Sequence, residues 1–199
     1  MRRLSSATAT AALALMTLAG VSTPATADTK LKAKLQGSQE APVCATSGSG
    51  SFEATMSDDE TSVSYVLKYD LEGTTVQQAH IHLGQKHVSG GITIWLCQTP
   101  AATPAFTDPT GLSPTCGTTP NTVTGTFTRA NVVGPAGQGI AGGAGGTTAE
   151  EFAQVIDEIL SHHTYVNVHS TLCPGGEVRG QIKADHKGEK GDKGEKGKK

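Results

Sequence analysis

Apolar and polar residues alternate through most of this chain, in short segments separated by glycine, proline, aspartate and serine. Side chains of a β-strand point alternately to its two faces, so this pattern is typical of half-buried strands. The segments are residues 29–36, 51–56, 61–71, 76–83, 91–97, 122–128, 164–170 and 176–184. They predict an all-β fold, an antiparallel Greek-key-like sandwich or barrel of about eight strands.

One stretch has helical periodicity instead. Thr147 or Thr148 can cap its start, with Glu150 or Glu151 three residues later completing a capping box. Apolar residues then recur on one helical face, at Phe152, Val155, Ile156, Ile159 and Leu160. We therefore expect one short helix before the penultimate strand.

Two long loops interrupt the strand pattern. Residues 98–120 contain five prolines and cannot form a central strand. Residues 134–146 are rich in glycine, and we expect a flexible loop there.

The two ends of the chain differ from its centre. Two arginines, a short apolar stretch and the sequence Ala25-Thr26-Ala27 indicate a secretory signal peptide at residues 1–27. Residues 186–199 have glycine at every third position, which is typical of collagen, but few triplets and no proline. We interpret them as a disordered, lysine-rich tail, with a trimerising stalk as the alternative. The folded domain is expected at residues 28–185.

The charge of the domain argues against a nucleic-acid partner, and its hydropathy argues against a membrane span. Without the leader and the tail, eight basic and fifteen acidic residues remain, a net charge of −7. Such a domain is poorly suited to nucleic acid. No apolar run outside the leader reaches the length of a membrane span, so we expect a soluble protein outside the cytoplasm.

Four cysteines, Cys44, Cys97, Cys116 and Cys173, are an even number, which in an exported protein suggests two disulfides. Three pairings are open, and we favour Cys97–Cys116 because it closes a local loop. The absence of a C-x-x-C pair argues against a zinc knuckle.

The histidines give the strongest indication of chemistry. In residues 76–83, Ala79 and Ile81 should face the core, which leaves His80 and His82 together on the outer face. In residues 164–170, the same alternation places His169 on an outer face. If these strands share a sheet, three imidazoles converge, a good ligand set for Cu(II) or Zn(II). Surface histidines without a metal are the alternative.

Other polar residues have auxiliary roles in this hypothesis. His87 is a candidate fourth ligand, while Glu177 and Arg179 share a strand face and are expected to form an exposed ion pair or to assist the site. No G-x-S-x-G, phosphate loop or H-E-x-x-H motif occurs, so the sequence favours binding over catalysis.

Four motifs in order, LQGSQEAPV (35–43), YDLEG (69–73), AHIHLG (79–84) and YVNVHSTLCPGGEVRGQI (165–182), resemble the CHRD (chordin-type) domain found in exported bacterial proteins. The resemblance covers residues 31–184. It implies a β-sandwich whose first strand lies near its last, and on that basis we favour the pairing Cys44–Cys173. The resemblance implies a fold rather than a particular activity.

A looser similarity links the histidine pattern to copper–zinc superoxide dismutase. It implies that His80, His82 and His169 are copper ligands and that Arg179 attracts an anion. The downstream zinc ligands of that family are missing, so this similarity supports a metal site rather than dismutase activity.

Three functions remain as hypotheses. The leading one is binding of a transition-metal ion, copper rather than zinc. The second is a metal-free extracellular interaction or structural module whose loops 98–120 and 134–146 contact a surface or protein partner. The third is a copper-dependent redox enzyme.

Overall fold

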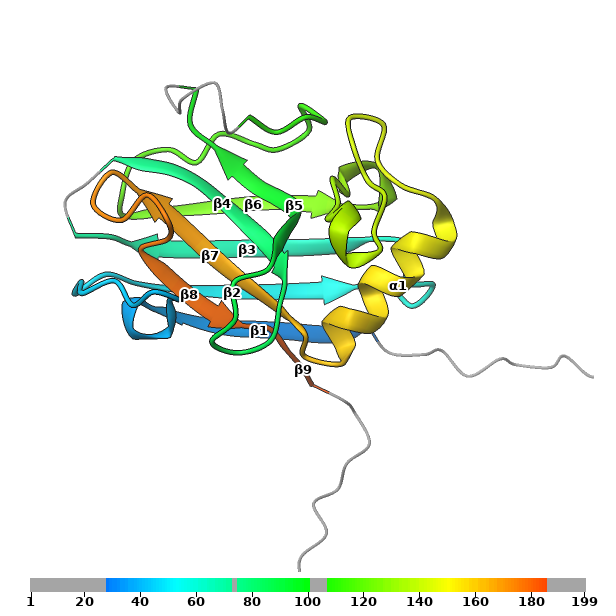
Figure 1. Cartoon of the computed structure of the whole chain (residues 1–199), viewed down its shortest axis with the longest axis horizontal. Coiled ribbons are helices and arrows are strands. Elements are labelled where there is room, and N and C mark those ends of the chain that lie inside the picture. Colours follow the sequence, from blue (N-terminus) through cyan, green and yellow to red (C-terminus); the bar gives the residue numbers. More distant parts are fainter. Residues whose placement is uncertain (1–27, 73–74, 101–106, 186–199) are drawn as a thin grey trace, which may run out of the picture.

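The computed structural model describes residues 28–72, 75–100 and 107–185 (Figure 1). The expected signal peptide at 1–27 and the expected tail at 186–199 lie outside these residues. Among the described residues, no helix combines the length and apolar character needed to cross a membrane.

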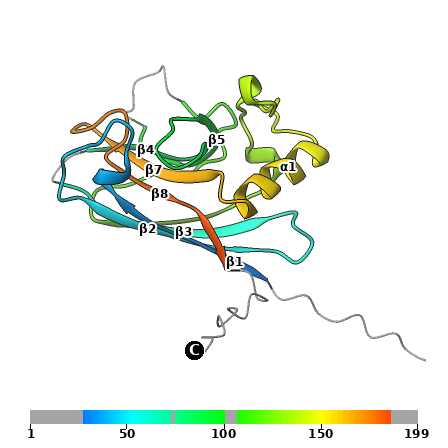
Figure 2. The same cartoon turned by 60° about the horizontal axis from the view of Figure 1, so that its bottom comes forward.

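The described chain forms one antiparallel sheet that curls into a nearly closed barrel, which confirms the predicted all-β fold. Neighbouring strands follow the order β5-β4-β7-β8-β1-β2-β3-β6, and β9 pairs with β1. Figures 1 and 2 show two layers, with β4, β5, β7 and β8 packed over β1, β2 and β3. The strands are β1 (Thr29–Gln36), β2 (Ser49–Met56), β3 (Val63–Asp70), β4 (Val76–Leu83), β5 (Gly91–Gln98), β6 (Asn121–Phe127), β7 (Thr164–Ser170), β8 (Val178–Gln181) and β9 (Lys183–Asp185).

The last predicted strand, 176–184, is divided in the structure. Its first part, β8, pairs with β7 and touches β1 through Gln36 and Arg179. Its second part, β9, pairs with β1 alone. The chain therefore passes from one layer to the other near Ile182, which is fully buried.

The core lies between the two layers, as alternation predicts. Phe52 and Leu67 from one layer and Ile81 and Val166 from the other are all fully buried in one apolar cluster. Burying each such side chain stabilises the fold by about 1.5–3 kcal/mol. The hydroxyl of Tyr65 donates to the Leu96 carbonyl at 2.6 Å and so links the layers by a hydrogen bond.

The predicted helix is present as α1 (Ala149–Leu160). Thr148 caps it, because its hydroxyl oxygen accepts from the Glu151 backbone N–H. Its buried residues are Phe152, Val155, Ile156 and Ile159, four of the five predicted, and Leu160 packs against the core while partly exposed.

The glycine-rich segment 134–146, for which the sequence predicts a flexible loop, packs closely against neighbouring backbone. It includes the short 3-10 helix η3 (Ala136–Gln138). The other 3-10 helices in the described part of the chain are η1 (Gly37–Gln39) and η2 (Arg129–Asn131). Ile140 is buried, and a Cβ at Gly142 would lie 2.5 Å from the Val132 carbonyl oxygen. The glycines thus allow close backbone packing here.

Two disulfides join Cys44 to Cys173 and Cys97 to Cys116. They are the two pairs that the sequence analysis favours. The first links the loop after η1 to the loop after β7, and both loops lie beside the candidate site described next.

Candidate metal centre

Strands β4 and β7 are hydrogen-bonded neighbours, and their register brings the three histidines together. His80 is opposite Asn167, His82 is opposite Tyr165, and His169 is opposite Gln78. Since side chains alternate along each strand, all three imidazoles lie on the face that points away from the core. The three rings are neighbours, with centroids 4.9 Å apart for His80 and His169 and 5.3 Å apart for His80 and His82.

Their ring nitrogens are close enough to share one ion. One nitrogen from each ring lies within 4.8 Å of the other two. The closest approach joins His80 Nδ1 to His169 Nε2 at 3.2 Å. Two imidazole nitrogens bound to a single tetrahedral ion at about 2.0–2.1 Å lie roughly 3.3 Å apart, so this separation suits a pair of ligands.

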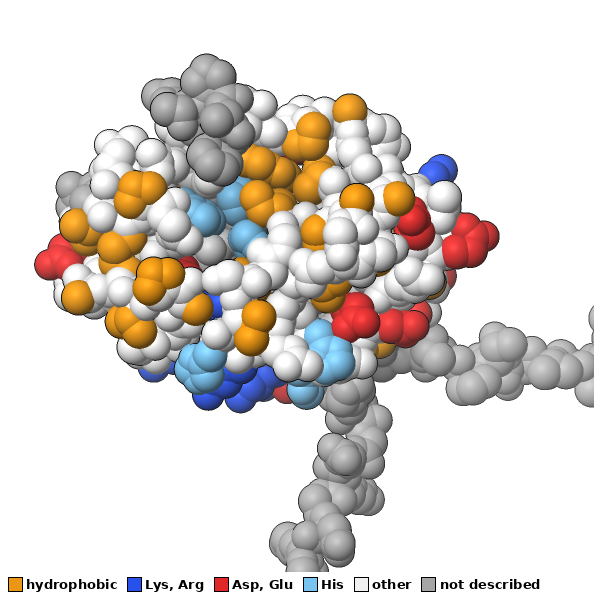
Figure 3. Space-filling model, in the orientation of Figure 1, with side chains coloured by type: hydrophobic (Ala, Val, Ile, Leu, Met, Phe, Trp, Pro, Cys, Tyr) orange, Lys and Arg blue, Asp and Glu red, His pale blue; other side chains and the backbone are white. Residues whose placement is uncertain are grey.

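The histidines are buried, although they lie on the outer face of the sheet that the sequence predicts for them. His80 is fully buried, and His82 and His169 are each 7% exposed. Alternation correctly gives the face, but it contains no information about which loops and side chains cover that face. The Trp95 ring packs edge-on against the His80 ring, with 4.2 Å between the ring centroids. The Tyr165 ring lies parallel to the His82 ring, with 4.7 Å between the centroids. Figure 3 shows histidine atoms at the floor of a hollow on this side of the molecule.

Backbone carbonyls orient two of the rings. His82 Nδ1 donates to the Gly90 carbonyl at 3.0 Å, and His169 Nδ1 donates to the Pro174 carbonyl at 2.9 Å. With the proton on Nδ1, each ring has its lone pair on Nε2. Among the described residues His82 Nε2 has no hydrogen-bond partner, whereas His169 Nε2 faces His80 Nδ1 at 3.2 Å. Metal-bound histidines usually have such a hydrogen bond on the nitrogen that faces away from the ion.

The cluster is held in the neutral form that binds metals. Burial lowers the pKa of His80 well below its usual value, and the neighbouring His169 and His82 lower it further. Burial also lowers the pKa of His82 to about 4, against the opposing effect of the Gly90 hydrogen bond. The pKa of His169 is lowered for the same reason. A metal would therefore displace few protons near pH 7.

A buried carboxylate beside the cluster, Glu40, was not singled out by the sequence analysis. It is 5% exposed, and burial raises its pKa to about 7, although Arg179 and a hydrogen bond from Asn167 lower it. Among the described residues its Oε1 has no hydrogen-bond partner. The only signal in the sequence is its place within the motif QEAPV, because a single acidic residue in a loop has no periodic pattern.

Arg179 and Glu177 differ from the exposed ion pair expected of them. Arg179 is 2% exposed, lies 3.4 Å above the Tyr165 ring and donates from Nη2 to the carbonyls of Gln85 and Val88, each at 2.9 Å. It therefore fixes the loop 84–90 and supports Tyr165, which in turn stacks on His82. This arrangement positions residues of the site, and it differs from the anion-attracting role that the superoxide dismutase similarity implies.

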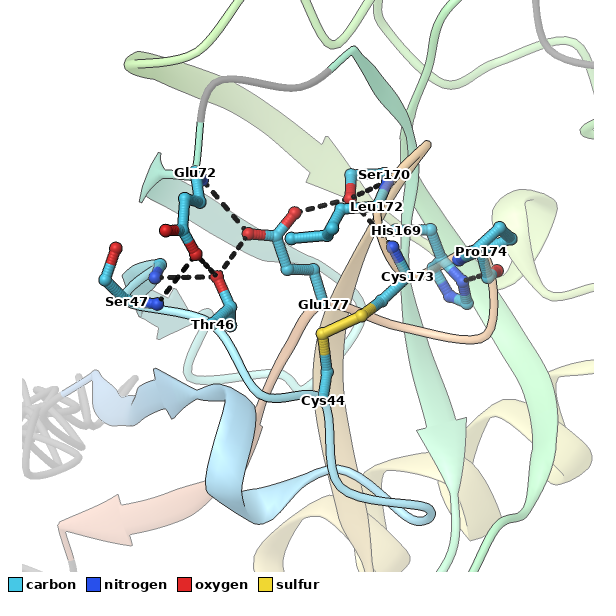
Figure 4. The surroundings of a disulfide bond; sticks show 11 residues. Cys44, Thr46, Ser47, Glu72, His169, Ser170, Leu172, Cys173, Pro174 and Glu177 are labelled. Atoms are coloured by element: carbon cyan, nitrogen blue, oxygen red, sulfur yellow. Dashed lines mark hydrogen bonds between the residues drawn. A yellow bond between two sulfur atoms is a disulfide. The ribbon is translucent and has the colours of Figure 1, made fainter.

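Glu177 is fully buried and connects three segments beside the Cys44–Cys173 disulfide (Figure 4). It accepts hydrogen bonds from the Ser170 hydroxyl, from Thr46 Oγ1 at 2.8 Å and from the Glu72 backbone N–H at 3.1 Å. His87, the candidate fourth ligand, is exposed on the β4–β5 loop and is not part of the cluster. Neither residue is grouped with the three histidines among the described residues.

A family model described as CHRD domain matches residues 31–182, a span that contains all three histidines and Glu40. A search of curated proteins finds no match to the chain.

Proposed function

This chain belongs to the CHRD domain family, and from that premise we propose that it binds one transition-metal ion through His80, His82 and His169. The observation that carries the proposal is the pair of Nδ1–H···O=C hydrogen bonds to Gly90 and Pro174. These bonds define the tautomer of two rings and place the lone pairs of both Nε2 atoms inside the buried cluster, where His82 Nε2 has no partner among the described residues and His169 Nε2 faces His80. Neutral, oriented imidazoles are what a copper or zinc site requires.

Copper is the ion we expect to bind more tightly. Sites built from nitrogen ligands follow the Irving–Williams order, in which Cu²⁺ binds more strongly than Zn²⁺. Glu40 lies near the cluster but is not grouped with the ligand atoms. The coordination set proposed here is therefore the three imidazoles.

We also propose that the protein works outside the cytoplasm. Two disulfides join the described cysteines, and disulfides persist mainly in oxidising compartments. The leader expected at residues 1–27 supports the same location.

A titration of the metal-free protein without residues 1–27 tests the metal proposal. Trp95 is the only tryptophan, and it touches His80, so its fluorescence reports on the site. We expect one Cu(II) per chain to quench it and Zn(II) to bind more weakly. Bound copper should also raise the melting temperature, since a ligand at 100 times its Kd stabilises the native state by about 2.7 kcal/mol.

Variants separate the site from adventitious binding. His169→Gln and His80→Gln should lose stoichiometric copper binding, whereas His87→Asn, which changes an exposed histidine with φ +64°, should retain it. Retention of copper by folded His169→Gln protein would contradict the proposed ligand set. Failure of folded wild-type protein to bind copper or zinc would favour the metal-free module.

A specific contact supports that second candidate. In a metal-free module, His80 Nδ1 would donate directly to His169 Nε2 across their 3.2 Å separation and so contribute to a buried polar network. One measurement distinguishes the two candidate functions. The melting temperature rises with copper concentration if the protein has the metal site, and it does not change if the protein is the metal-free module.

A further inference from the structure

The lysines of this acidic domain are gathered on one side. Residues 28–185 contain six lysines, and all of them line three grooves on the outer surface around β1, β2, β3 and β9. On β1 they alternate with the buried residues Leu31, Ala33 and Leu35. The six are Lys30, Lys32, Lys34, Lys68, Lys86 and Lys183. Figure 3 shows blue side chains along the lower edge of that view.

The three grooves adjoin one another, because neighbouring grooves share a lysine. The first, of about 520 Å³, contains Lys32, Lys34, Lys86 and Lys183. The second, of about 490 Å³, shares Lys32 with it, and the third, of about 660 Å³, shares Lys34 and adds Lys68. We call this continuous surface the lysine face.

Most of these charges are available to a ligand. Lys32 forms an ion pair with Asp185 at 2.7 Å, and Lys30 donates to Thr55 Oγ1 at 2.8 Å. In the described part of the chain, Lys34, Lys68 and Lys183 form no ion pair. Three acidic residues, Glu53, Asp70 and Asp185, also line the grooves, so the surface has six lysines against three carboxylates. A domain with net charge −7 thus has an excess of positive charge on this one surface, which attracts anions locally.

The rest of the lysine face indicates what kind of anion fits. Lysines at every second residue of a strand are roughly 6.6–7 Å apart, which suits an extended polymer with repeated charges. Gln36, Gln39, Ser51 and Asn121 line the same grooves, and their amides and hydroxyls can hydrogen-bond to sugar hydroxyls. The aromatic residues of these grooves, Phe52, Tyr65 and Tyr69, are buried and offer no platform for stacking bases.

A membrane surface fits less well. The exposed large apolar residues, Val43, Val88, Leu112 and Leu172, line none of the three grooves. Insertion into a lipid interface requires apolar side chains beside the basic ones. We propose that the lysine face binds an acidic polysaccharide bearing sulfate or carboxylate groups. This proposal involves none of the histidines and stands independently of metal binding.

Binding to immobilised dextran sulfate, with uncharged dextran as the matched control, tests the proposal. The lysine-rich tail can itself attract anions, so two triple variants with the same loss of charge are compared in the protein without residues 1–27. One changes the lysine face, Lys34→Gln, Lys68→Gln and Lys183→Gln. The other changes the tail, Lys193→Gln, Lys196→Gln and Lys198→Gln.

We expect dextran sulfate to bind and dextran not to bind. The face variant should bind about tenfold more weakly with a shallower salt dependence, and the tail variant should change binding by less than about threefold. An equal loss in both variants, or a loss confined to the tail variant, would overturn the proposal. Equally tight binding of the wild type to single-stranded DNA or to anionic phosphatidylglycerol vesicles would also overturn it, because the lysine face would then lack the selectivity proposed.

Discussion

Burial, more than neighbouring charge, determines the protonation of individual side chains around His80. Desolvation is the largest cause of the lowered pKa of His80, His82 and His169, and also of the raised pKa of Glu40. In each case the buried group favours its neutral form. At the scale of the residue, the site is therefore a buried polar cluster with little net charge of its own.

Glu40 gives this cluster a stability that depends on pH. Its pKa is raised from 4.5 to about 7 in the folded protein, so the folded state holds the proton more tightly than the unfolded state. The contribution of protonated Glu40 to the free energy of unfolding is fully present below about pH 4.5 and is lost as the pH rises through about 7. Glu40→Gln mimics the protonated form at every pH and should remove this loss.

We predict that the free energy of unfolding of Glu40→Gln, relative to that of the wild type, increases when the pH is raised from 5 to 8. The gain should be on the order of 3 kcal/mol at most, since one pKa unit corresponds to about 1.36 kcal/mol. Denaturant unfolding of both metal-free proteins at the two pH values measures it, and histidine titration cancels in the comparison. Glu53→Gln, an exposed position on β2, is the control. A difference that is the same at both pH values would show that Glu40 does not titrate in this range.

At the scale of the element, strands position the histidines and loops hold them in place. The β4–β5 loop supplies the Gly90 carbonyl to His82, and Arg179 donates to two other carbonyls of the same loop. Gly90 itself has no room for a side chain, because a Cβ there would lie 1.7 Å from the Leu83 carbonyl oxygen. Glycine is thus required for the close approach of two backbone segments.

Gly90→Ala should therefore weaken metal binding without changing any ligand. The backbone must shift, which should cost about 1–3 kcal/mol of folding free energy, and the His82 ring should lose its orienting carbonyl. Losing such a partner typically weakens metal binding by about 10–100-fold. Copper affinity measured by chelator competition checks the prediction. Gly137→Ala is the matched control, since a Cβ there meets nothing within 4 Å, and equal affinity in both variants would refute it.

The difference between strands and loops also explains which features could be predicted from the sequence. Alternation placed His80, His82 and His169 on one face because strand geometry repeats every two residues. The loops that reach this face, at Glu40, Gly90 and Pro174, have no such repeat. Their packing depends on contacts between residues far apart in the chain, such as Ser89 Oγ with the Ala41 carbonyl. The burial of the histidines and the position of Glu40 were therefore not predictable from periodicity.

For the whole molecule, the Cys44–Cys173 disulfide joins the first and last thirds of the chain at the edge of the site. Pro174, next to Cys173, supplies the carbonyl that orients His169 (Figure 4). Glu40 lies four residues before Cys44. The same covalent link thus restrains two segments that contribute to the histidine cluster, whereas Cys97–Cys116 closes a loop elsewhere.

The two disulfides should consequently differ in what their removal does. Cys44→Ala with Cys173→Ala opens a link across 129 residues and should cost roughly 4–5 kcal/mol, while Cys97→Ala with Cys116→Ala opens one across 19 residues and should cost roughly 3 kcal/mol. Only the first pair should also weaken copper binding, because only it releases the Pro174 carbonyl. Denaturant unfolding and chelator competition on both double variants measure the two effects. If both variants bound copper as the wild type does, orientation of His169 would depend on strand packing alone, and the disulfide would act on stability without acting on the site.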